Sequence, residues 1–102
     1  MNSAMHSAEI EAFERDVEQI IQEAASYWEP FLAFLGLRVS MYIARSKLTP
    51  YKSTLDLQVS TEGGKTLWFD SLILYMEGER WVDLEEVKIF LKLAIQRSLS
   101  EL

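Results

Sequence analysis

The spacing of the apolar residues changes along this chain, and that change constrains the fold more than any other feature. Between residues 10 and 28 the apolar positions recur every three or four residues, which is typical of a helix with one buried side. In residues 37–44 and 54–60 they recur at every second position, which is typical of strands with one buried face. The sequence therefore predicts a helix followed by half-buried strands.

The first helix is expected to begin at the capping residue Ser7, which leaves residues 1–6 as a flexible N-terminal tail. Pro30 lacks an amide hydrogen, so it should end or kink the helix or open a short second turn, and Gly36 is placed as the left-handed stop. The predicted polar side is Glu11, Glu14, Arg15, Glu18, Gln22 and Glu29. The predicted buried side is Ile10, Phe13, Val17, Ile20, Ala24 and Trp28, widened by Ile21 and Tyr27.

A third strand is expected over residues 66–76, joined to the second by a hairpin turn at residues 62–65. A last helix should start at Asp83, whose carboxylate can cap the first turn together with Glu86. That helix has so little polar surface that we expect it to be enclosed on most sides. The predicted fold class is α+β, with the order helix, three-stranded antiparallel meander, helix, in a single domain over residues 7–102.

Composition narrows the function classes. The 102 residues include no cysteine, so a disulfide framework, a thiolate zinc site and a thiol nucleophile are excluded. The N-terminus lacks the pattern of a signal peptide, and no segment approaches the about 18 apolar residues of a membrane span. We therefore expect a cytoplasmic protein with no membrane partner. The only histidine, His6, falls in the predicted tail, and no cofactor or metal motif is present.

The charge is acidic and unevenly distributed. The net charge is −6, and residues 1–36 hold seven acidic residues against one basic residue. The order helix, three strands, helix resembles that of double-stranded RNA-binding domains. An acidic domain without a basic helix start is nevertheless a poor match for phosphate backbones, so no nucleic-acid partner is expected.

The register of the predicted hairpin decides which residues face solvent. Leu57 and Val59 of the second strand share the core face with Leu67 and Phe69 of the third if the loop has five residues (61–65) or three residues (63–65). A two-residue turn would mix the faces. The five-residue loop places Asp56 opposite Asp70, and the three-residue loop places Gln58 opposite Asp70. Two facing carboxylates would titrate as a pair, as in acid catalysts and some metal sites.

If both helices cover one face of the sheet, the third strand turns apolar side chains toward water. Monomers seldom expose large apolar patches, so this outer face is a candidate protein-binding surface. The alternatives are a bulge near Asp70–Ser71 that rotates the second half of the strand inward, or one helix on each face. The candidate binding residues are Arg38, Tyr42, Asp56, Gln58, Trp68, Asp70, Leu72, Leu74 and Met76.

Three functional hypotheses follow. The first is a non-enzymatic protein-binding module, in its sharper form an acidic inhibitor of the immunity or antitoxin kind that binds a basic effector. The second is a homodimeric chaperone or structural subunit that associates through the last helix and the outer face of the sheet. The third is a small carboxylate-dependent enzyme that uses Asp56 and Asp70.

Overall fold

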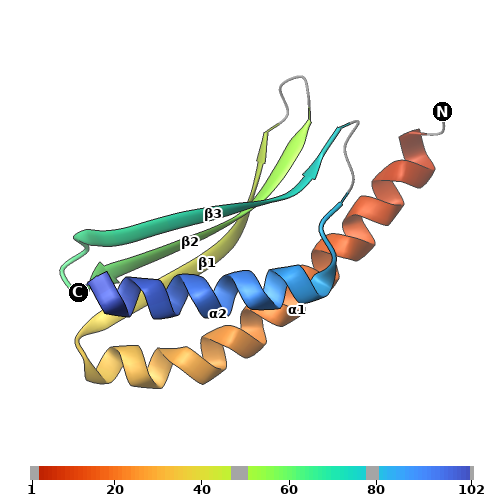
Figure 1. The fold of residues 1–102 in the computed structure, drawn as a ribbon. Coiled ribbons are helices and arrows are strands. Elements are labelled where there is room, and N and C mark those ends of the chain that lie inside the picture. Colours follow the sequence, from red (N-terminus) through yellow and green to blue (C-terminus); the bar gives the residue numbers. More distant parts are fainter. Residues whose placement is uncertain (1–2, 47–50, 78–80, 102) are drawn as a thin grey trace.

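The computed structural model describes residues 3–46, 51–77 and 81–101, with only the backbone described for residues 3–7. The elements are α1 (Ser3–Phe34), β1 (Leu37–Ser46), β2 (Lys52–Thr61), β3 (Thr66–Met76) and α2 (Leu84–Glu101). The strands form one antiparallel sheet in the order β1-β2-β3 (Figure 1). The predicted α+β fold, with its helix, meander and helix, is confirmed.

The protein has two layers. Both helices lie on one face of the sheet and run in the same direction, while the other face carries no helix (Figure 1). Leu55, Leu57 and Val59 of β2 are fully buried beneath the helices, and the alternation predicted for β1 and β2 is confirmed. The core between the layers is formed by Val17, Ile20, Ile21, Leu55, Leu57, Val59, Leu74, Val87, Leu91, Ala94 and Ile95.

Helix α1 is longer than the sequence predicts. It begins at Ser3 rather than at Ser7; Met1 and Asn2 of the predicted tail lie outside the described residues. Pro30 does not end it, since the helix continues to Phe34. Pro30 and Ser26 are both exposed, so the carbonyl that loses its intrahelical donor at Pro30 can be hydrated. The predicted stop is confirmed at Gly36, which has a φ of 76° and donates its amide to the Ala33 carbonyl at 3.0 Å.

Helix α2 begins as predicted. The Asp83 carboxylate accepts the backbone amide hydrogen of Glu86 at 2.9 Å, which satisfies one of the free donors of the first turn. The helix buries Val87, Leu91, Ala94, Ile95 and Ser98 against the sheet and α1. It is not enclosed on most sides, because Ile89 and Leu93 are 54% and 41% exposed. The prediction of an enclosed helix is therefore wrong for its outer side.

The hairpin register differs from both predicted registers. Ser60 pairs with Thr66, as the five-residue loop requires, but the next pair is Val59 with Trp68. Leu67 is thus an extra residue in β3, and this bulge turns the following side chains, as far as Ile73, to the face opposite the predicted one. Phe69, predicted to face the core, instead lies on the outer face opposite Gln58.

A second shift lies farther along β3. Ile73 pairs with Thr54, whereas Tyr75 pairs with Ser53, so Leu74 is an extra residue. Leu74 and Tyr75 are both buried. The two irregularities together let β3 contribute two adjacent apolar side chains to the core at its C-terminal end. Neither irregularity falls at Asp70–Ser71, where the sequence offered a bulge as an alternative.

Candidate protein-binding groove

The structure divides the predicted binding residues between the two faces of the sheet. Arg38, Tyr42, Asp56 and Gln58 lie on the outer face, as expected from the alternation of β1 and β2, and Met76 pairs with Lys52 of the same face. The other four candidates were expected to face water, and they are Trp68, Asp70, Leu72 and Leu74. This expectation is wrong, because the bulge at Leu67 turns the first three inward and Leu74 is itself buried in the core.

Asp56 and Asp70 do not form a pair. Asp56 lies opposite Ser71, and Asp70 lies opposite Leu57, so the two carboxylates are on different faces of the sheet. The Asp56 carboxylate instead accepts hydrogen bonds from the hydroxyl groups of Ser71 at 2.7 Å and Thr54 at 3.0 Å. The geometric premise of the carboxylate-dependent enzyme is therefore not met.

The largest exposed apolar side chains lie at the C-terminal end of α1. Tyr27 is 75% exposed and Phe34 is 87% exposed, while Phe31 and Leu35 are each about half exposed. The prediction that Tyr27 widens the buried side of the helix is wrong. Tyr27, Phe31 and Phe34 follow one another at spacings of four and three, so they lie along one side of the helix. That side is a continuous aromatic surface.

Trp28 connects this surface to the core. It is partly buried against the core, and its ring makes edge contacts with Tyr27 at 5.2 Å and with Phe31 at 6.4 Å between ring centroids. Edge-to-face contacts of this kind hold aromatic side chains in defined orientations. The rings of Tyr27 and Phe31 are therefore preorganised by their contacts with Trp28.

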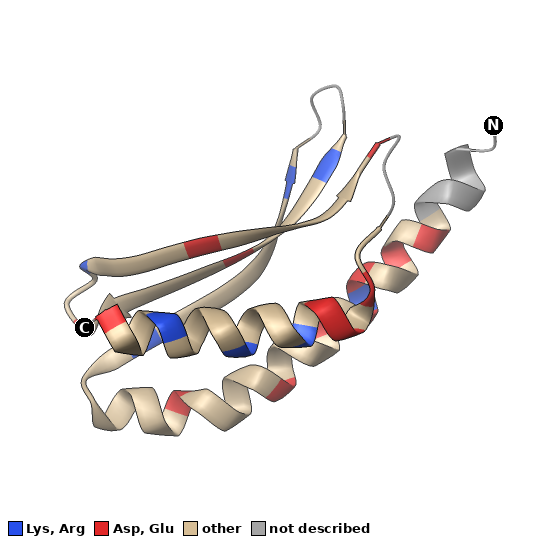
Figure 2. Cartoon of the chain, in the orientation of Figure 1, with Lys and Arg blue, Asp and Glu red and all other residues tan. Residues whose placement is uncertain are grey.

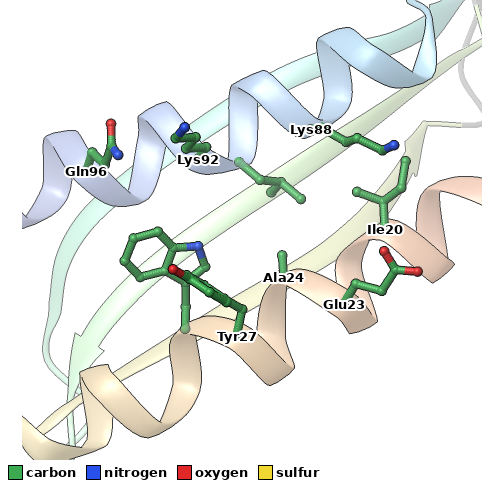
Figure 3. A pocket seen from close by; sticks show the side chains of 9 residues that line it. Ile20, Glu23, Ala24, Tyr27, Lys88, Lys92 and Gln96 are labelled. Carbon is green, nitrogen blue, oxygen red and sulfur yellow. The ribbon is translucent and has the colours of Figure 1, made fainter.

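A groove separates α1 from α2 next to these rings. Its volume is about 430 Å³, within the range of small ligand pockets. Figure 3 shows Glu23, Ala24 and Tyr27 of α1 on one side of the groove and Lys88, Lys92 and Gln96 of α2 on the other. Apolar atoms form most of its surface, and charged groups lie along its edges. The lining residues are Ile20, Glu23, Ala24, Tyr27, Trp28, Lys88, Leu91, Lys92 and Gln96.

The two walls of the groove carry opposite charges. Figure 2 shows mostly acidic positions along α1, whereas α2 carries basic positions along its middle and acidic positions at its two ends. Glu23 lies on the α1 wall, and Lys88 and Lys92 lie on the α2 wall. Within the described residues, the salt bridges join Glu14 to Arg45 and Glu85 to Lys88, so none of them crosses the groove. The groove is open and its charged edges are not neutralised across it.

An ion pair between a buried carboxylate and a partly exposed arginine holds α1 on the sheet outside the groove. Arg45 donates from Nε and Nη2 to one oxygen of Glu14 at 2.9 and 2.8 Å, and the Ser53 hydroxyl donates to the other oxygen at 3.0 Å. Hydrogen bonding to Glu14 raises the pKa of Arg45. Burial, reinforced by the charge of Glu14, raises the pKa of Tyr51.

Glu14 was predicted on the polar side of α1. This prediction is wrong, because Glu14 is only 6% exposed. Its spacing could have revealed the burial: Glu14 lies four residues after Ile10 and three before Val17, within the apolar pattern. Ser53 is also buried, so the carboxylate and the hydroxyl group of this cluster are both shielded from solvent. Its role is to hold the two layers together.

No group of three or more histidine, cysteine, aspartate or glutamate residues in the described ranges is arranged to hold a metal ion. No helix of residues 3–46, 51–77 and 81–101 is both long enough and apolar enough for a membrane crossing. Comparisons with protein-family models, curated proteins and solved structures find no match to this chain. The functional argument therefore depends on the surface of the molecule itself.

Proposed function

We propose that this chain is a protein-binding module that holds an apolar helical segment of its partner in the groove between α1 and α2. The observation that carries the proposal is the exposure of Tyr27, Phe31, Phe34 and Leu35 beside an open groove. Folded monomers usually leave only small apolar patches in water, and larger ones are typical of interaction sites.

The composition of the groove supports this function. Its base is apolar, with Ile20, Ala24 and Leu91, and its edges are polar, with Glu23 and Lys92. Protein interfaces have the same organisation, an apolar centre that excludes water and a polar rim that fixes orientation. Exposed aromatic side chains are enriched among the residues that contribute most to binding. A groove between two helices is also a common receptor for a third, amphipathic helix.

The sharper hypothesis, an acidic inhibitor of a basic effector, stays a prediction, as does a cytoplasmic location. The acidic residues of α1 provide a surface that would accelerate association with a basic partner. The apolar contact surface, however, differs from the outer face of the sheet that the sequence favoured.

The proposal is tested by selecting helical peptides from a displayed library on the immobilised protein. The protein is attached at low density, so that two copies cannot meet. We expect selected peptides to carry apolar residues at spacings of three and four. The variant with Tyr27→Ser and Phe34→Ser should weaken their binding at least tenfold.

A matched control removes two aromatic residues of the outer sheet face, with Tyr42→Ser and Phe69→Ser, since these side chains are also exposed. Peptide binding should be unchanged in this control. Selection of no helical peptide, or equal binding to the wild type and the Tyr27/Phe34 variant, would overturn the proposal.

A further inference from the structure

We infer that the partner is a second copy of this chain, whose helix layer packs face to face on this one and covers the groove, so that the protein is a dimer. The inference rests on the proposed function of the groove surface, and it identifies the partner. Three features of the described residues lead to it: the charges of the two groove walls, the direction of the helices, and the apolar residues on the outer side of α2.

The charges make this surface complementary to itself. Glu23 of α1 lines one wall, and Asp16 lies two helical turns earlier on the same side of the helix. Lys88 and Lys92 line the other wall. Lys88 already pairs with Glu85 of its own helix, but no salt bridge of the described residues crosses the groove, so Glu23 and Lys92 of the two walls can pair with a second molecule. A surface with an acidic wall and a basic wall suits a two-fold symmetric contact.

The direction of the helices selects one arrangement. α1 and α2 run the same way across the sheet (Figure 1). A two-fold axis parallel to both helices places α1 of each copy against α2 of the other, so acidic walls meet basic walls. A two-fold axis in the same plane but perpendicular to the helices would place α1 against α1 and bring like charges together, which is destabilising. Electrostatics therefore favours the parallel axis.

The apolar residues fit the same arrangement. Ile89 and Leu93 are exposed on the outer side of α2, and Tyr27 and Phe34 are exposed on α1. Pairing α2 with α1 of the second copy removes both sets from water. Each contact occurs twice in a two-fold dimer, so a modest patch on one chain becomes a larger buried interface. The acidic Asp16 and Glu23 and the basic Lys88 and Lys92 then lie along the same interface.

The experiment is a charge exchange measured by sedimentation equilibrium of the full chain at micromolar concentrations. The wild type should be a dimer whose dissociation constant rises with salt. Glu23→Lys and Lys92→Glu should each raise the dissociation constant at least tenfold, because each replaces an attraction with a repulsion twice per dimer. The variant with both substitutions should return to within about threefold of the wild type, since acidic and basic positions are merely exchanged.

The control is Arg38→Glu, which makes the same charge change on the exposed outer face of the sheet. It should leave the dissociation constant unchanged. A monomeric wild type at about 100 µM, or a dimer insensitive to both single substitutions, would overturn the inference. If the wild type is monomeric but the selected peptides still bind the groove, the proposed function stands and the occupant is a different protein. If neither occurs, both proposals fail.

Discussion

Replacing Arg45 with methionine tests whether the Glu14–Arg45 pair holds α1 on the sheet. The substitution keeps much of the aliphatic side chain but removes two charge-assisted hydrogen bonds to Glu14. The Glu14 side chain is only 8% exposed, whereas that of Arg45 is 46% exposed. After the substitution, the carboxylate stays buried with the Ser53 hydroxyl as its described donor.

The expected cost follows from this asymmetry. A hydrogen bond to a charged group contributes about 1.5–3 kcal/mol, and leaving a buried charge unpaired costs about 3–5 kcal/mol. Because water reaches Arg45, we expect Arg45→Met to lower the free energy of unfolding by about 2–3 kcal/mol. Glu14→Gln should cost only about 1 kcal/mol, because the exposed guanidinium that it leaves behind can be hydrated.

Urea unfolding of the two single variants and the double variant measures these differences and their coupling. The double variant should be more stable than Arg45→Met alone, since no buried charge remains. The matched control is Arg38→Met, which removes an exposed arginine from the other face of the same strand and should change stability by less than about 0.5 kcal/mol. The reasoning is refuted if Glu14→Gln costs more than Arg45→Met, or if Arg45→Met equals the Arg38 control.

The other predictions concern the register and the response to pH. Because Trp68 packs on the core and Phe69 is 54% exposed, Trp68→Ala should cost about 3–5 kcal/mol in urea unfolding and Phe69→Ala about 1 kcal/mol or less; the reverse order would contradict the register. The raised pKa of Tyr51 means that its contribution to stability is complete below its unfolded pKa of about 10 and is lost as the pH rises through the higher folded pKa. Between pH 9 and 11.5 (roughly the titration range of tyrosine) the wild type should therefore lose more unfolding free energy than Tyr51→Phe, and parallel curves would contradict this.

The candidate site was only partly predictable from the sequence. The surplus of apolar residues correctly indicated exposed apolar side chains, but the sequence assigned them to Trp68, Leu72 and Leu74, which lie in the core or pack against it. The groove residue Tyr27 was assigned to the buried side of the helix, and the exposed Phe34 was missed because Pro30 was expected to end or kink the helix before it. Had the helix been extended through Pro30, the spacing of Tyr27, Phe31 and Phe34 would have predicted a second apolar side.

Local periodicity by itself determined the five elements, the inward residues of β1 and β2, and the ends of the helices at Gly36 and Asp83. These features depend on interactions between residues close together in the sequence, so they can be predicted from the sequence alone. The tertiary structure alone decided the bulge at Leu67 and the open side of α1. A bulge depends on how facing strands and the helices above them pack, and an alternating strand gives no local sign of one extra residue. Whether Tyr27 is covered depends likewise on where α2 lies, which no periodicity within α1 can specify.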